Sequence, residues 1–177
     1  SANGGGPAVS SFVAVNGTTY TFNVLRGSSD GTVSVSIAAS KANDAATNQN
    51  VASNTYTITI DTLSPTVVLS TPLNPTNVSP FTVTAKFSEN VTGVDISDFA
   101  VVNGATSNFV PVNATTYTVS VTPSASPITI DMAASAAADA ATNNSTAATQ
   151  LSVVYDNTNP TVVLSTPLNP TNVSPFT

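Results

Sequence analysis

The chain has 177 residues and a formal net charge of −6, from three basic and nine acidic residues. It contains no Cys and no His, which excludes disulfides, Ser–His–Asp triads, Cys–His pairs and the usual zinc ligand sets. The acidic balance also argues against nucleic acid and anionic membranes as partners, because both require clustered Lys and Arg.

The remaining composition favours an all-β protein. Only 7% of the residues are charged and 41% are hydrophobic, which is not the composition of a disordered chain. Val, Ile and Thr suit strands, whereas Asn, Gly and Pro suit turns. No run of 18 apolar residues occurs, so we expect no membrane insertion.

Alternation of apolar and polar residues with a period of two predicts strands along the chain. In residues 1–63 the apolar members of these strands are Tyr20, Phe22, Val24, Val33, Val35, Ile37, Tyr56, Ile58 and Ile60. Further along, the predicted strands cover residues 66–70, 81–87, 99–102, 108–112, 117–121, 128–132 and 151–155. About seven strands in a segment of this length are typical of an antiparallel immunoglobulin-like sandwich. The Ala-rich stretch 133–141 is predicted to be a strand end and a loop, since it is short for a helix.

An 18-residue string, PTVVLSTPLNPTNVSPFT, occurs at Pro65–Thr82 and again, unchanged, 95 residues later at Pro160–Thr177. The strings AASKANDAATNQN, from Ala38, and AASAAADAATNNS, from Ala133, keep the same offset. Similarity at a fixed period indicates structural repeats in tandem. The sequence therefore predicts a partial repeat (the C-terminal half of a sandwich), a complete repeat and the start of a third, at residues 1–63, 64–158 and 159–177.

A partial sandwich leaves a strand edge and part of its core uncovered, which is an aggregation liability. The missing strands can come from further sequence in a longer chain, or from another copy of the chain. We favour the longer chain, because the segment 160–177 matches only the first strand of the complete repeat and the start of the second.

Several motifs of the chain, taken in their order and spacing, point to a known family. They are FSENVTGVDISDF at Phe87–Phe99, TTYTVSVTP at Thr115–Pro123, DAATN at Asp139–Asn143 and YDNTNPTV at Tyr155–Val162. With these motifs the chain resembles the bacterial Ig-like tandem repeats of large surface adhesins, over essentially its whole length. The resemblance implies extended stalks of Ig-like domains, often stiffened by Ca²⁺ at the domain junctions. In one departure, Thr47 and Thr142 stand where the family commonly has Gly, which argues against a backbone-carbonyl ligand that needs a glycine-type conformation there.

Five of the nine carboxylates are predicted to meet at one end of the complete sandwich, where alternate connections between strands gather. They are Asp61, Glu89, Asp95, Asp98 and Asp139. No Lys or Arg is predicted to lie near them, and crowded carboxylates repel one another. Ca²⁺ takes about six to eight oxygen ligands, so we predict a Ca²⁺ site here, to which Asn143 can add a side-chain oxygen. The alternative is that these are solvated turn residues, since Asp favours turns.

We expect no enzymatic activity. The residue types present leave only a carboxylate pair, such as Glu89 with Asp95 or Asp98, as used in glycoside hydrolysis. The chain has no Trp, and its Tyr and Phe residues mostly occupy predicted core positions. No aromatic platform for a sugar is therefore predicted beside such a pair.

The leading functional hypothesis is a structural segment of an extracellular adhesin stalk, which spaces a binding tip from the cell surface and has junctions stiffened by Ca²⁺. The alternative is a self-assembling extracellular filament or surface-layer subunit that is completed by strand donation between chains. In both cases the predicted partners are neighbouring repeats of the same chain or other copies of it. A ligand-binding adhesin domain is less supported, because near-identical repeats indicate spacing rather than recognition.

Overall fold

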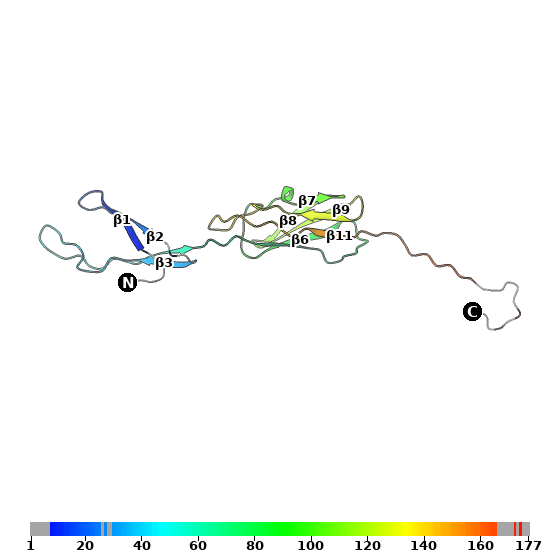
Figure 1. Cartoon of the computed structure of the whole chain (residues 1–177), viewed down its shortest axis with the longest axis horizontal. Coiled ribbons are helices and arrows are strands. Elements are labelled where there is room, and N and C mark those ends of the chain that lie inside the picture. Colours follow the sequence, from blue (N-terminus) through cyan, green and yellow to red (C-terminus); the bar gives the residue numbers. More distant parts are fainter. Residues whose placement is uncertain (1–7, 26, 28–29, 166–171, 173, 175–177) are drawn as a thin grey trace.

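The computed structural model describes residues 8–25, 27, 30–165, 172 and 174 (Figure 1). Its N-terminal region contains β1 (Ala8–Ala14), β2 (Tyr20–Leu25), β3 (Gly31–Val35) and β4 (Tyr56–Ile60). In this region β1 pairs with β2 and β3 pairs with β4, both antiparallel. Figure 1 shows these strands at one end of an elongated molecule, with extended chain at the other end. The predicted third repeat at 159–177 lies largely outside the described residues.

A complete two-sheet sandwich follows the linker at Asp61. One sheet has the order β5-β6-β9-β8, formed by Val67–Ser70, Phe81–Phe87, Thr116–Pro123 and Gly104–Asn113. The other has the order β11-β10-β7, formed by Leu151–Val153, Ile128–Asp131 and Ala100–Val102. All these pairings are antiparallel, which confirms the predicted all-β, immunoglobulin-like fold.

Helical structure is confined, among the described residues, to the short 3-10 helix η1 (Ile96–Asp98). The Ala-rich stretch 133–141 forms turns and a bridge, which confirms the predicted loop, but it contains no strand end because β10 ends at Asp131. In the part of the chain that the structure describes, no helix has the length and apolarity needed to span a bilayer.

The core of the complete repeat lies between its two sheets and follows from the alternation in the sequence. In β6, Phe81, Val83, Ala85 and Phe87 are buried, whereas Thr82 and Lys86 are exposed on the opposite face. From the opposite sheet, Ile128 and Ile130 of β10 are fully buried. Because successive strand residues point to opposite faces, a period of two places each apolar set on the core side.

The N-terminal region repeats the strand registers of the complete repeat. Val33 lies opposite Ile58 in the β3–β4 pair, and 95 residues later Ile128 lies opposite Val153 in the β10–β11 pair. The β1–β2 and β8–β9 pairs likewise share a register shift at equivalent places. The same local sequence patterns thus form the same ladders in both regions.

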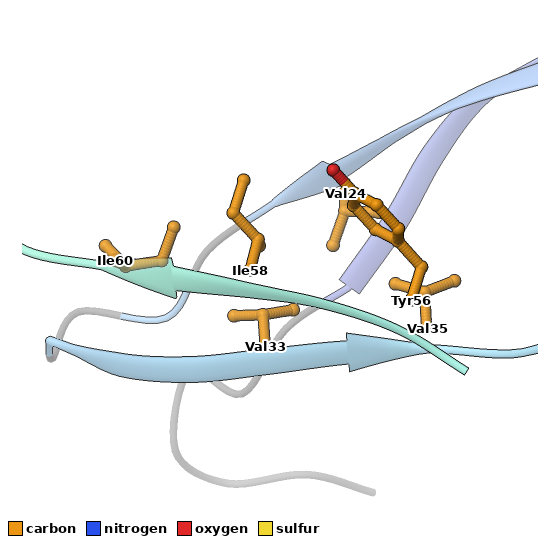
Figure 2. A pocket seen from close by; sticks show the side chains of 6 residues that line it. All are labelled: Val24, Val33, Val35, Tyr56, Ile58 and Ile60. Atoms are coloured by element: carbon orange, nitrogen blue, oxygen red, sulfur yellow. The ribbon is translucent and has the colours of Figure 1, made fainter. Parts of the chain in front are cut away.

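The N-terminal region differs in what covers these ladders. Among the described residues before Asp61 there is no counterpart of β5 or β6. Six apolar side chains line a shallow hollow there: Val24, Val33, Val35, Tyr56, Ile58 and Ile60, which we call the open face (Figure 2). Val24 is 38% exposed, whereas its counterpart Val121 in the complete repeat is fully buried. The open face is therefore an apolar surface that is more exposed than the equivalent surface of the complete repeat.

The connection between β5 and β6 forms an isolated bridge to the chain just after β11. Thr76 forms a parallel bridge with Tyr155, through hydrogen bonds from the Thr76 N–H to the Val154 carbonyl (2.9 Å) and from the Asp156 N–H to the Thr76 carbonyl (3.0 Å). The side-chain amide of Asn74 adds two more, donating to the Ser152 carbonyl and accepting from the Val154 N–H. Four hydrogen bonds therefore hold the point at which the chain leaves the complete repeat.

Candidate metal centre

Three of the predicted carboxylates meet at the end of the complete repeat that faces the N-terminal region. Asp61 lies in the linker, Glu89 directly follows β6, and Asp139 lies in the connection between β10 and β11. One carboxylate oxygen from each lies within 4.8 Å of the other two. Asp139 is buried, and the other two are partly buried. The structure thus brings together an acidic cluster of Asp61, Glu89 and Asp139.

Local backbone hydrogen bonds hold the segments that carry Glu89 and Asp139. Ser88, next to Glu89, donates its N–H to the Thr66 carbonyl (2.9 Å) and accepts the Thr66 N–H on its hydroxyl (3.0 Å). Thr92 and Ala138 exchange two backbone hydrogen bonds, of 2.8 and 3.0 Å. These bonds connect the loop after β6 to the loop of Asp139, so the two carboxylates are held by ordered backbone.

The Asp139 loop is organised around its own carboxylate. One oxygen of Asp139 accepts the N–H groups of Ala141 and Asn143, both at 2.8 Å. The other oxygen accepts the side-chain amide of Asn143 at 2.8 Å. The same amide donates to the Asp61 backbone carbonyl at 3.2 Å. Asn143 therefore connects the linker to the loop, a role that differs from the oxygen ligand considered from the sequence.

The electrostatics of the acidic cluster show unbalanced negative charge. Burial raises the pKa of Glu89 above its usual value, and the charges of Asp61 and Asp139 raise it further. In contrast, the side-chain amide of Asn143 lowers the pKa of Asp139; burial opposes this effect, and backbone N–H groups of the loop add to it. Hydrogen bonds thus favour the ionised form of Asp139, while burial and the two neighbouring carboxylates oppose ionisation of Glu89.

Asp95 and Asp98 do not belong to this acidic cluster. The Asp95 carboxylate accepts the N–H and the hydroxyl of Ser97, both at 2.6 Å, and caps η1. The carboxylate of Asp98 accepts the Asp95 N–H at 2.8 Å, which completes a capping box. The three-residue spacing of the two aspartates is the sequence signature of such a box. Both carboxylates therefore have a local structural role that the sequence interpretation missed.

Threonine at the glycine position of the Asp139 loop does not prevent a glycine-type conformation there, contrary to the expectation from the sequence. Thr142 has φ +69°, and its counterpart Thr47 in the N-terminal region has φ +67°. Both threonines thus adopt the left-handed, glycine-type conformation despite their β-branched side chains. The hydrogen bonds around Asp139, and the equivalent bonds around Asp44, hold the loop in this conformation and oppose the strain.

The residues of the acidic cluster fit a hard divalent cation. Three carboxylates offer only oxygen donors, and about six to eight oxygens, including carbonyls and water, surround Ca²⁺. A cation placed among them would offset both effects that raise the pKa of Glu89, its burial and the repulsion from Asp61 and Asp139. Asp61 comes from the linker, so such an ion would join the linker to the sandwich.

The fold and the position of this cluster define an immunoglobulin-like sandwich with an acidic cluster at its linker end. The family model of the bacterial Ig-like domain matches residues 61–155, which include the linker aspartate and all seven strands of the sandwich. The chain belongs to this family. No curated protein and no solved structure was found to match it.

Proposed function

We propose that the chain is a structural segment of an extracellular adhesin stalk, in which Ig-like repeats space a binding tip from the cell surface. The family supports a structural, extracellular type of domain, and domains of this family are typically non-catalytic. We include in the proposal that this chain has no enzymatic activity of its own. A spacer requires an elongated arrangement of domains, and the strands of the two regions follow one another along the long axis of the molecule (Figure 1).

The second part of the proposal is that Ca²⁺ stiffens the junction at Asp61. The observation that carries it is the position of a linker carboxylate within 4.8 Å of two carboxylates fixed on the sandwich. Without a cation the three charges repel, which favours a mobile linker. With Ca²⁺ bound, the linker is tied to the loops after β6 and β10, so the angle between the two regions becomes restricted. The same residue type recurs at Asp156, 95 residues further on.

Thermal unfolding of the whole chain, in chelator and in millimolar Ca²⁺, tests the stability part of the proposal. Ca²⁺ that binds only the folded state stabilises it by mass action, so the melting temperature of the complete repeat should rise by roughly 7 °C at about tenfold excess over the Kd. Glu89→Gln should remove most of the rise. Asp131→Asn is the matched control, because Asp131 lies outside the acidic cluster and bonds to Gln150. An unchanged melting curve across millimolar Ca²⁺ would reject the site.

The stiffening itself is measured by the width of the distribution of distances between the two regions. Because the chain has no Cys, spin labels can be placed at two introduced cysteines, Thr32→Cys on β3 and Thr82→Cys on β6, both at exposed positions. Ca²⁺ should narrow the distribution of label distances measured by pulsed electron resonance. The distribution should stay broad in Glu89→Gln. A distribution that Ca²⁺ leaves unchanged in the parent chain would contradict the stiffening.

A further inference from the structure

One surface turn of the N-terminal region holds an asparagine amide in a reactive arrangement. Asn16 and Gly17 lie between β1 and β2, and both are exposed. The side-chain oxygen of Asn16 accepts the N–H of Thr18 (2.9 Å) and the hydroxyl of the same residue (3.0 Å). The ring closed by the first of these bonds folds the Asn16 side chain back toward the peptide bond that contains the Gly17 nitrogen. An electrophilic amide carbon and a backbone nitrogen are thus neighbours in an exposed turn.

The surroundings of Gly17 leave its nitrogen free to react. Among the described residues, none accepts a hydrogen bond from the Gly17 N–H. A Cβ atom at Gly17 would meet nothing within 4 Å, so no neighbouring group obstructs the turn. Glycine also has no side chain that shields its nitrogen or restricts rotation of the peptide. The two donors on the Asn16 oxygen would stabilise negative charge that develops there during attack, as donors do in an oxyanion hole.

The complete repeat carries the same turn with one change. The side-chain oxygen of Asn113 accepts the N–H and the hydroxyl of Thr115, both at 2.9 Å. Asn113 and Ala114 are exposed beside a closed core, so the accessibility belongs to the turn itself. Ala114 stands in place of Gly17, and its methyl group hinders the approach of its nitrogen to the amide carbon. The chain therefore contains a control for the effect of glycine.

A second Asn–Gly pair, Asn103–Gly104, lies in a fixed environment. The side-chain amide of Asn103 donates to the Pro127 carbonyl at 2.8 Å. Gly104 is partly buried in the β8–β9 pair, and a Cβ atom there would lie 3.1 Å from the Thr122 carbonyl oxygen. Both the amide and the peptide that would attack it are thus restricted. The third such pair, Asn3–Gly4, lies outside the described residues.

We propose that Asn16 is a site of spontaneous deamidation, activated by the turn that holds it. The Gly17 nitrogen attacks the side-chain carbonyl carbon of Asn16 and loses its proton to water or hydroxide. The new C–N bond closes a succinimide ring, and the amide nitrogen takes up a proton and leaves as ammonia. Water then adds to one of the two ring carbonyls and breaks its bond to the ring nitrogen, which leaves aspartate or isoaspartate at position 16. The site is independent of the proposed spacer role and of Ca²⁺.

The two products differ in their effect on the hairpin. Aspartate keeps the turn, because the carboxylates of Asp61 and Asp156 accept the N–H two residues further on in the same way. Isoaspartate adds a methylene group to the main chain between β1 and β2, which disturbs the register of their pairing. Deamidation therefore adds a negative charge in both cases and alters the backbone in one.

Ageing of the whole chain at mildly alkaline pH, followed by peptide mass spectrometry, tests the site. Asn16 should be converted to the acid about tenfold faster, or more, than Asn103 and Asn113. Labelling by isoaspartyl methyltransferase should place isoaspartate at position 16, and Gly17→Ala should lower the rate there to that of Asn113. Conversion of Asn16 no faster than that of Asn103 would overturn the proposal.

Urea separates the effect of the turn from that of the sequence. Asn16 and Asn103 are both preceded by Val and followed by Gly, so in the unfolded chain they should react at the same rate. A difference of the same size in urea would show that the fold does not activate Asn16, and would contradict the role of the turn.

Variants of the complete repeat test the turn beside a closed core. Ala114→Gly should make Asn113 react about tenfold faster, or more, than in the parent chain, since it places an Asn–Gly pair in the same hydrogen-bonded turn. Adding Thr115→Val removes the hydroxyl donor but keeps the N–H, and should slow this reaction by about threefold or more. Melting curves of both variants confirm that the repeat stays folded. Asn113 that remains intact in Ala114→Gly, or a rate that Thr115→Val leaves unchanged, would overturn the proposal.

Discussion

The N-terminal region and the complete repeat contain the same strand ladders, but only one of them has a core. Val35 and Ile130 occupy equivalent positions, at the same register in β3–β4 and β10–β11. Ile130 is fully buried between two sheets, whereas Val35 belongs to the open face. The two regions therefore separate the formation of strand pairs from the burial of their apolar side chains. The sequence of each region determines the strand pairs and their registers, and the covering strands β5 and β6 determine whether those pairs bury apolar surface.

The largest expected difference between the regions is in the effect of removing an equivalent side chain. Ile130→Ala should lower the free energy of unfolding of the complete repeat by about 3 kcal/mol, because it leaves a cavity in a closed core. Val35→Ala should cost less than about 1 kcal/mol, because the open face already contacts water. Hydrogen exchange at the amides of β9 and β2 reports the two regions in one sample. Equal costs in both regions would show that the open face is covered in solution.

A second difference concerns pH. Asp139 and Asp44 occupy equivalent loops, and hydrogen bonds lower both pKa values, with the side-chain amide of the following Asn as the main cause. Only the loop of Asp139 lies beside Glu89, whose pKa is raised. The folded complete repeat therefore binds a proton at Glu89 at a higher pH than the unfolded chain does. Its stability should rise as the pH falls from 7 toward the usual glutamate pKa of 4.5.

This pH effect should be specific to Glu89 and to metal-free protein. Melting temperatures in chelator should show a smaller rise for Glu89→Gln than for the parent chain over the same pH range. Below the usual aspartate pKa of 3.8, stability should fall, because protonation of Asp139 and Asp95 removes hydrogen bonds to their ionised forms. In Ca²⁺ the trend between pH 7 and the glutamate pKa should reverse, since protons compete with the cation. An identical pH profile for parent and variant would contradict the raised pKa.

The smallest expected effect is that of replacing threonine by glycine in the equivalent loops of Asp139 and Asp44. Thr142→Gly should raise the free energy of unfolding by about 0.5 kcal/mol, because glycine relieves the strain at φ +69° but is more flexible in the unfolded chain. Thr47→Gly should have the same effect on the N-terminal region, whose loop has the same geometry. Urea unfolding of the complete repeat measures the first effect. Destabilisation by Thr142→Gly would show that the threonine side chain makes a favourable contact that outweighs the strain.

How much of the fold and of the acidic cluster can be predicted from the sequence depends on how far apart along the chain the interacting residues lie. Strands such as β6 and β9 follow from alternation alone, because their apolar faces have a period of two and a closed core to occupy. The convergence of Glu89 and Asp139 follows from the rule that alternate connections share one end of a sandwich. Asp95 and Asp98 could not be placed by that rule, because a capping box within their own loop competes for both carboxylates.

Other features needed the three-dimensional structure. Asn143 has one side-chain amide and several potential acceptors, and only the folded loop shows that it bonds to both Asp139 and the linker carbonyl of Asp61. Thr142 gives no signal of a left-handed conformation, because its residue type disfavours it. The hydrogen bonds of the compact loop thus select the acceptors of Asn143 and override the conformational preference of Thr142.

The bridge between Thr76 and Tyr155 has a mechanical consequence. The two segments run parallel, and Thr76 and Asn74 together make four hydrogen bonds to the last residues of the complete repeat. The chain enters this repeat at one end and leaves it at the other (Figure 1). Tension along the molecule therefore pulls Tyr155 along the paired segments, across the hydrogen bonds of the bridge. In this shear geometry the four bonds bear the load together instead of opening one after another. The exit of the repeat is thus reinforced against pulling by a loop that contributes no strand to either sheet.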